Sequence, residues 1–233
     1  MDKILEIKNL NKGFDDFQLK NISLSVPTGT IVGLIGENGA GKSTIINLIE
    51  NLLKEDSGEI YVFGENMREN EKRLKQKMGI IYDTCHYNEK FKCQDIENMM
   101  KLVYDNWDST LYNEYLDKFD LPRNKRIEKF SKGMKMKLCF AAELAHHPRL
   151  LILDEATSSI DTRTELQIQE AFETMMKGRT TFIVAHRLST IKNADMILVM
   201  DKGHILEQGT HQELLEKQGY YYNLHNSQFN LAK

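Results

Sequence analysis

The segment at residues 36–43, with the sequence GENGAGKS, follows the pattern GxxxxGK[ST]. It stands between an apolar run at residues 30–35 and apolar residues at helical spacing from 45 to 53, which predicts a strand, a loop and a helix. Glycines let the backbone curl so that successive N–H groups point at one phosphate, and the helix N-terminus adds a favourable dipole. Lys42 would add a positive charge, and the Ser43 hydroxyl could bind Mg²⁺. The pattern therefore predicts a site for a nucleotide phosphate chain.

Two carboxylates, Asp154 and Glu155, follow the apolar run at residues 150–153. Open α/β sheets bind their ligands at the carboxyl ends of strands, so these acids are expected to face the phosphate loop. Asp154 is predicted to hold Mg²⁺ through water, and Glu155 to act as a base or to position the water that attacks a γ-phosphate. By themselves two such acids also fit a solvated strand end, and the phosphate loop favours the catalytic interpretation.

Composition narrows the class of protein. The 233 residues, 41% of them apolar, are enough for one sizeable core. Because 31 basic and 34 acidic residues give a net charge of −3, no uniformly basic surface is available and no nucleic-acid partner is expected. The three cysteines form no CxxC pair and are predicted to be ordinary thiols in a reducing compartment. No apolar run reaches the roughly 20 residues that span a bilayer, so membrane association is expected to come from a partner.

The elements that must position these residues follow from periodicity. Alternating apolar and polar residues in the first 30 predict short antiparallel strands. From about residue 69 to 148 the pattern is mostly helical, with a break at 121–124, and indicates an inserted helical lobe. Near the end of its last helix, His146 and His147 are predicted to be a solvated pair. Three further buried strands of a mostly parallel sheet are predicted at residues 150–153, 180–185 and 196–200. A helix is predicted between the first two of them, near residues 164–176.

The end of the chain carries two local signals. Residues 201–204 are predicted to form a hairpin turn, and Thr210 with Glu213 a capping box that opens a last helix.

The sequence FSKGM at residues 130–134 opens a predicted helix and resembles the signature sequence of ATP-binding cassette (ABC) ATPases. In that family Ser131 and Gly133 would contact the γ-phosphate of the nucleotide held on the opposite subunit. Ser131 also fits a helix N-cap, and the two roles are compatible because exposed amides bind anions. The second glycine and the glutamine usual in the family are replaced here by Lys132 and Met134.

The resemblance covers nearly the whole chain and implies further roles. Residues 159–161 look like the D-loop, so Asp161 would reach the dimer interface, and His186 looks like the switch histidine, although a lone histidine also fits a structural role. Phe14 matches the aromatic that stacks on adenine, or else belongs to the core. Asp83 replaces the usual glutamine, and its carboxylate would bind the metal directly, through water, or not at all.

The implied site divides into three sets. The catalytic residues would be Glu155 and His186. The metal ligands would be Ser43, Asp83 and Asp154. The residues expected to contact ATP are Phe14, Gly36, Asn38, Gly39, Ala40, Gly41, Lys42, Ser43, Thr44, Ser131, Gly133 and Asp161.

The fold implied is α/β: one ABC ATPase domain over residues 1–233, with a RecA-like P-loop NTPase core at 1–84 and 150–233, an antiparallel β subdomain, and a helical subdomain at about 85–149. The function implied is ATP hydrolysis, with Mg²⁺, that powers a membrane transporter. Two chains, a second copy or a homologous subunit, would close head-to-tail around ATP. A separately encoded transmembrane subunit would hold the chain, otherwise cytoplasmic, at the inner face of the cell membrane.

Two alternatives remain open at this point. A soluble ABC-type ATPase not coupled to transport could use the same residues, as could an ATP-dependent dimerisation module with negligible turnover. A separate hypothesis concerns origin: the first two-thirds resemble stand-alone ATPase subunits and the last third resembles exporters that fuse membrane and ATPase parts, which indicates a mosaic, natural or engineered. The transported substrate cannot be inferred, because its pathway would lie in the membrane part.

Overall fold

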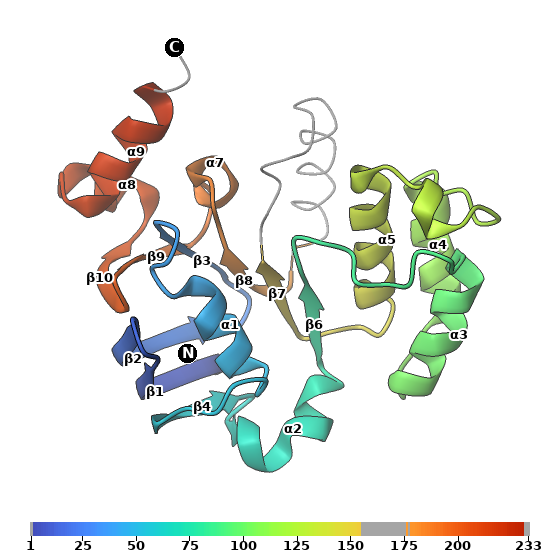
Figure 1. Ribbon diagram of the computed structural model, residues 1–233, viewed down its shortest axis with the longest axis horizontal. Helices are drawn as coiled ribbons and strands as arrows, with labels where there is room; N and C mark the ends of the chain where they lie inside the picture. The colour runs from blue at the N-terminus through green and yellow to red at the C-terminus, as the bar shows by residue number, and fades with distance from the viewer. Residues whose placement is uncertain (1, 155–175, 177, 231–233) are drawn as a thin grey trace.

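The computed structural model describes residues 2–154, 176 and 178–230, and its chain path is drawn in Figure 1. In these residues the strands form a four-stranded sheet of order β2-β1-β4-β5 and a six-stranded sheet of order β10-β9-β3-β8-β7-β6. The strands are β1 (Lys3–Gly13), β2 (Gln18–Pro27), β3 (Ile31–Gly36), β4 (Ser57–Val62), β5 (Glu65–Asn66), β6 (Met78–Ile81), β7 (Leu150–Asp154), β8 (Thr180–Val184), β9 (Met196–Asp201) and β10 (His204–Gly209).

The helices lie between and around these strands. They are α1 (Lys42–Ile49), α2 (Met67–Lys75), α3 (Cys93–Val103), α4 (Ser109–Lys118), the 3₁₀ turn η1 (Ile127–Lys129), α5 (Lys132–Leu144), α7 (Leu188–Ile191), α8 (His211–Glu216) and α9 (Tyr220–Asn230). In the part of the chain that the structure describes, none of them is long and apolar enough to cross a membrane.

The six-stranded sheet is parallel except at its β10 edge. β3 pairs in parallel with both β8 and β9, β7 pairs in parallel with β6 and β8, and only β10 runs antiparallel, to β9. Every residue of β8 is buried, as expected for a parallel strand covered on both faces. The mostly parallel sheet and the hairpin predicted from the sequence are therefore confirmed, and so is the antiparallel pairing of the N-terminal strands.

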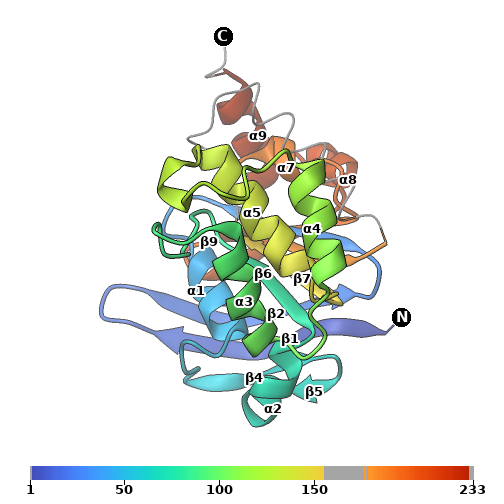
Figure 2. The same cartoon turned by 90° about the vertical axis from the view of Figure 1, so that its right-hand side faces the viewer.

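The two faces of this sheet pack against different layers. Neighbouring residues on one strand belong to different apolar clusters: Leu151 packs with residues of α3, α4 and α5, whereas Ile152 packs with α1 and the four-stranded sheet. Successive side chains of a strand point to opposite faces, which explains this alternation. Figure 1 shows α3, α4 and α5 on the side away from β1 and β2, and Figure 2 brings these helices to the front.

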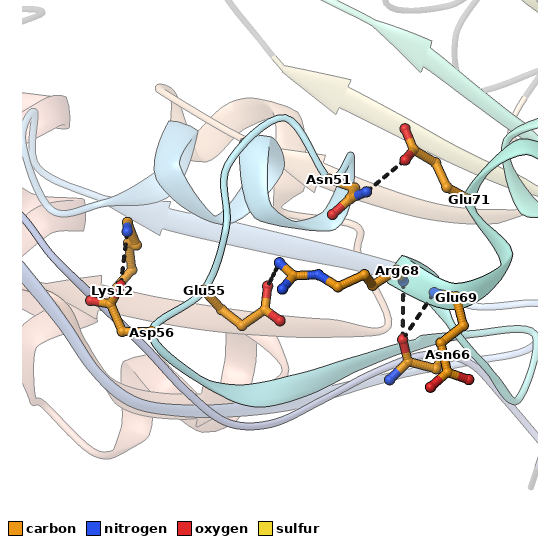
Figure 3. Close-up of polar contacts among 8 residues, drawn as sticks. All are labelled: Lys12, Asn51, Glu55, Asp56, Asn66, Arg68, Glu69 and Glu71. Carbon is orange, nitrogen blue, oxygen red and sulfur yellow. Dashed lines mark hydrogen bonds and ion pairs between the residues drawn. The ribbon is translucent and has the colours of Figure 1, made fainter.

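Ion pairs tie the loop that follows α1 to its surroundings (Figure 3). Lys12 Nζ lies 2.9 Å from Asp56 Oδ1, and Arg68 lies 2.5 Å from Glu55. The Asn66 side chain caps α2 by accepting from the backbone N–H of Arg68, 3.0 Å away. These contacts join β1, the loop and α2, so the C-terminal end of α1 is held against the four-stranded sheet.

Helix α1 is shorter than the predicted helical spacing from 45 to 53. It ends at Ile49, and Asn51 takes a left-handed conformation with φ 56°. Asparagine tolerates this conformation at a helix C-terminus, where it reverses the chain. The Asn51 amide donates to Glu71 at 2.6 Å, and Leu52, beyond the reversal, is 61% exposed. The predicted extent was therefore wrong, because a turn intervenes before the last apolar residues.

Helices α3, α4 and α5 confirm the mostly helical pattern predicted in this part of the chain, and the predicted break lies between α4 and η1. The predicted solvated histidine pair was wrong for one member. His147 is exposed and leaves the helix with φ 56°, but His146 is only 1% exposed and stacks on Tyr104 with ring centroids 3.7 Å apart. The chain reverses after His146, so its ring is turned into the core and not into solvent.

Two predictions near the end of the chain have different outcomes. The capping box of Thr210 and Glu213 is confirmed: the Thr210 hydroxyl accepts from Glu213 N, and the Glu213 carboxylate accepts from Thr210 N at 2.9 Å. The box opens α8 and α9 follows, so the prediction that it opens the last helix was wrong. The helix predicted at residues 164–176 lies outside the described residues except for Met176, which is buried.

Candidate functional site

The phosphate loop joins the end of β3 to the start of α1, as its sequence predicts. Gly41 is the N-cap of α1 and has φ 107°, a left-handed conformation that only glycine adopts readily. Gly36 is fixed by space: a Cβ added there would lie 2.0 Å from the carbonyl oxygen of Met200 on β9. The conformation of the loop therefore depends on these glycines, and a side chain at either position would distort it.

Lys42 is almost fully buried, with 4% exposed. Its Nζ donates hydrogen bonds to the backbone carbonyl oxygens of Gly36 at 2.8 Å and Glu37 at 3.0 Å. Burial lowers the pKa of Lys42, and the negative charge of Asp154 opposes that shift. The loop thus holds an ammonium group within its own curve, where it can meet an anion bound to the loop amides.

Sheet register brings three further side chains to the same edge. Asp154 is the last residue of β7 and pairs with Val184 of β8, while Leu153 pairs with Ile81 of β6. His186 follows two residues after Val184, and Asp83 follows two residues after Ile81. Because the carboxyl ends of parallel strands meet at one edge, the residues that leave β6, β7 and β8 lie beside the phosphate loop.

The charges at this edge act on one another. Burial raises the pKa of Asp154, and the carboxylate of Asp83 raises it further, whereas His186 and Lys42 lower it. Burial lowers the pKa of His186, and Lys42 adds to that shift, while the two aspartates oppose it. The structure therefore brings Lys42, Asp83, Asp154 and His186 within electrostatic reach, although they come from four separate segments.

A cavity of about 450 Å³ opens over the loop, a volume in the range of ligand sites. Its lining includes six residues expected to contact ATP or its phosphates, namely Asn38, Gly39, Gly41, Lys42, Ser43 and Thr44, together with His186. Asp16 and Phe17 also line it and were missed by the sequence analysis. The one available signal was their place in the same turn as Phe14.

Phe14 does not line that cavity. The residue is 47% exposed, and its ring centroid lies 6.4 Å from that of Phe17 and 5.6 Å from Lys12 Nζ. The alternative that Phe14 belongs to the core is therefore wrong. An exposed ring beside a ligand cavity remains available to stack on a base.

Ser131 and Gly133 begin helix α5, at a distance along the chain from the phosphate loop. The Ser131 side chain is the N-cap and accepts from the backbone N–H of Met134 at 3.2 Å, so the predicted cap is confirmed. Ser131 is exposed and Gly133 is buried. Neither lines the cavity over the phosphate loop of its own chain.

Two predicted site residues, Glu155 and Asp161, lie outside the described residues. Among residues 2–154, 176 and 178–230, no three His, Cys, Asp or Glu side chains gather closely enough to hold a metal ion unaided. A Mg²⁺ ion still fits, because it keeps several waters and usually takes one or two carboxylates plus substrate phosphates. The mutual repulsion of Asp83 and Asp154, which raises the pKa of Asp154, is the charge pattern that a cation would relieve.

Comparison with known proteins connects this site to one family. The profile of the ABC transporter family matches residues 19–158, which include the phosphate loop and Asp154. Two curated relatives are each named an ATP-dependent lipid A-core flippase. The one from Haemophilus influenzae is 39% identical and the one from Syntrophus aciditrophicus is 37% identical, each over 97% of this chain. This chain covers 41% and 39% of those proteins, so it spans about two-fifths of the relatives that it matches.

Solved structures share the fold. A bacterial Atm1-family ABC exporter with ATP bound superposes with a TM-score of 0.82 and 30% identity, over 96% of this chain and 41% of that chain. An ATP-binding subunit of an ABC transporter gives a TM-score of 0.83 over 99% of this chain and all of that chain, and its 24% identity supports the shared fold alone. The predicted α/β P-loop fold is confirmed. The mosaic origin stays a prediction, because these alignments run over both parts of the chain together.

Proposed function

Since this chain belongs to the ABC transporter family, we propose that it binds and hydrolyses ATP in order to power transport across a membrane. The observation that carries the proposal is the meeting of Lys42, Asp154 and His186 beside the phosphate loop, with the charge interactions described above. A buried cation within a loop of amides suits a triphosphate, and a carboxylate at the neighbouring strand end suits its metal ion.

The nucleotide would be held at both ends. The backbone amides of residues 39–43 and the Lys42 ammonium would surround the β- and γ-phosphates, with the dipole of α1 favouring their charge. Phe14 would stack on the adenine, since its exposed ring stands near the cavity that Phe17 lines. The remaining predicted contacts, Gly36, Asn38, Ala40 and Thr44, would shape or line the loop.

The hydrolytic step would depend on residues from neighbouring strands. Ser43, Asp83 and Asp154 would hold Mg²⁺, which when bound neutralises phosphate charge. Glu155 would position and deprotonate the attacking water, and His186 would hydrogen-bond the γ-phosphate. Because the pKa of His186 is lowered by burial and by Lys42, its ring favours the neutral form, which can still donate one hydrogen bond.

A second subunit would complete each site. Ser131 is exposed at the N-terminus of α5 and does not line its own chain's phosphate cavity, so it suits a nucleotide held by a partner. We infer that two copies of this chain, or this chain and a homologous subunit, close head-to-tail with Ser131 and Gly133 of one facing the phosphate loop of the other. Asp161 would lie at that interface.

ATP hydrolysis by this chain would drive a membrane-spanning transporter part. We place that part on a separate polypeptide and this chain on the cytoplasmic side of the membrane. The relatives named as ATP-dependent flippases support coupling to membrane transport, and the similar Atm1-family exporter favours export as its direction. Magnesium dependence, dimerisation and the transmembrane partner are all parts of this proposal.

A steady-state ATPase assay tests it, with Glu155→Gln as the variant. The native chain should release phosphate in a Mg²⁺-dependent manner. Turnover by the variant should be lower by a factor on the order of 10²–10⁴, which is the usual contribution of general acid–base catalysis to the rate. The variant should also accumulate as an ATP-bound dimer, detected by size-exclusion chromatography. Undiminished hydrolysis by the variant would remove Glu155 from this role.

The same assay separates the alternatives. ATP binding and dimerisation without phosphate release in the native chain would favour a dimerisation module. Turnover that does not change when the chain is reconstituted with its membrane partner in vesicles would favour a soluble ATPase that is not coupled to transport.

A further inference from the structure

Two of the three cysteines meet in the folded chain. Cys85 packs against the apolar cluster that contains Cys139. A hydrogen bond between the two thiols lowers the pKa of Cys85 and raises that of Cys139, and neither cysteine is part of a disulfide. Cys85 lies in the loop that leaves β6, and Cys139 lies inside helix α5. Both were predicted from the sequence to be ordinary thiols, and their wide spacing gave no sign of a pair.

Cys85 is the more exposed of the two cysteines. Cys85 is half-buried and lines a surface cavity of about 250 Å³ together with Asp83, Lys132 and Lys135. Cys139 is 9% exposed and packs in the apolar cluster behind it. A small oxidant that enters the cavity therefore meets Cys85, which lines it, before Cys139, which does not.

The third cysteine provides an internal comparison. Cys93 is 1% exposed at the start of α3, and among the described residues neither Cys85 nor Cys139 influences the pKa of its thiol. Burial raises the pKa of its thiol. A buried thiol of this kind is expected to be inert.

We propose that Cys85 and Cys139 form a reversible, peroxide-sensitive disulfide. The Cys85 sulfur attacks one peroxide oxygen, the O–O bond breaks, and Cys85 becomes a sulfenic acid while the other oxygen leaves as water or alcohol. The Cys139 sulfur then attacks the Cys85 sulfur, the S–S bond forms, and the sulfenic oxygen leaves as water with the Cys139 proton. The two thiols lose two electrons in total, and the peroxide gains them.

The backbone allows this closure. A disulfide needs an S–S distance of about 2 Å. Because this is shorter than a non-bonded contact, one of the two cysteines must move towards the other. Cys139 is held by helix α5, whereas Cys85 belongs to a loop with neither helix nor strand between β6 and α3. The loop can supply the movement. The bond would fasten the segment that carries Asp83 to helix α5, which Ser131 caps.

Peptide mapping of the native protein tests the proposal without any variant. The chain is treated with hydrogen peroxide, remaining thiols are alkylated, and the unreduced digest is analysed by mass spectrometry. We expect a peptide pair joined through Cys85 and Cys139, lighter by two hydrogen atoms than the separate peptides, with Cys93 alkylated. Dithiothreitol should restore both thiols. Oxidation of Cys85 without a link to Cys139, or equal oxidation of Cys93, would overturn it.

Variants separate the two chemical steps. Cys93→Ser should form the same linked pair. Cys139→Ser should stop at the Cys85 sulfenic acid, which a dimedone probe labels, and Cys139→Ala serves if the serine variant does not fold by circular dichroism. On a non-reducing gel the oxidised protein should migrate as a monomer. Migration as a dimer would show a link between two chains and would contradict a disulfide within one chain.

A functional consequence rests on the proposed ATPase activity. Fastening the Asp83 segment to α5 should slow turnover, and dithiothreitol should restore it. A disulfide that leaves turnover unchanged would overturn only this consequence. A reduced chain that hydrolyses no ATP would contradict the proposed function and leave the disulfide, detected by mass alone, intact.

Discussion

The hydroxyl of Tyr82 donates a hydrogen bond to Oε2 of Glu50, and this contact ties the end of β6 to the C-terminus of α1. Glu50 is 4% exposed, and its other oxygen, Oε1, has no hydrogen-bond partner among the described residues. Helix α1 begins at the phosphate loop, and Asp83 directly follows Tyr82. The contact therefore connects the two segments that are proposed to hold phosphate and metal.

We expect Tyr82→Phe to lower the free energy of unfolding by about 1–3 kcal/mol, because the buried Glu50 carboxylate would lose the hydrogen bond that the Tyr82 hydroxyl donates. Urea denaturation followed by circular dichroism measures this change. Tyr115→Phe is the matched control, since it removes the same atom from a partly buried ring that stacks on Phe119. Equal effects of the two substitutions would contradict the importance of the hydrogen bond.

Glu50 should also make stability depend on pH. Burial raises the pKa of Glu50, and the hydrogen bond from Tyr82 opposes the shift only in part. Below the ordinary value of 4.5 both the folded and the unfolded chain hold the proton. As the pH rises past that value, the unfolded chain releases the proton before the folded chain does, so this group's contribution to stability falls until the pH passes the folded pKa.

Glu50→Gln removes this titration. The free energy of unfolding of the native chain should therefore fall relative to that of the variant as the pH rises from 4.5 towards neutrality. Urea titrations at several pH values measure the two curves, with Glu114→Gln, an exposed residue of α4, as control. If the free energy of unfolding changed with pH in the same way for the native chain and Glu50→Gln, Glu50 would have the same pKa in the folded and unfolded chains, contrary to this prediction.

Gly36→Ala should lower the free energy of unfolding by about 1–3 kcal/mol, since its methyl group would collide with the Met200 carbonyl and force the loop or β9 to shift. Gly13→Ala is the matched control: its added Cβ meets only Asp56 Oδ2, at an ordinary 3.5 Å, and a change within about 0.5 kcal/mol is expected. Thermal or urea unfolding compares them. A neutral Gly36→Ala would mean that the loop accommodates a side chain.

Asp83→Asn should raise the Mg²⁺ concentration needed for half-maximal ATPase activity by on the order of tenfold, because it removes a carboxylate from the edge where Asp154 lies. The maximal rate at saturating Mg²⁺ should change less. Asp105→Asn, at an exposed position after α3, is the control. An unchanged Mg²⁺ curve for Asp83→Asn would exclude Asp83 from the metal site.

Local signals in the sequence were enough to locate the phosphate loop, the acidic end of β7 and the capping box of Thr210. Each depends on residues within a few positions of one another, where glycine conformation, strand burial and helix capping act. Strands β3, β7, β8 and β9 were predicted from the same kind of signal, whereas β4, β5 and α7 were not predicted. Where a local signal was incomplete, as at Asn51, the predicted helix extended too far.

The tertiary structure alone decided which distant residues meet. Sheet register placed Asp83, Asp154 and His186 at one edge, and the packing of α5 put Cys139 against Cys85. Likewise, Tyr82 meets Glu50 only because β6 ends beside α1. These contacts join side chains from separate elements, and their formation depends on how whole elements pack, which no short stretch of sequence encodes.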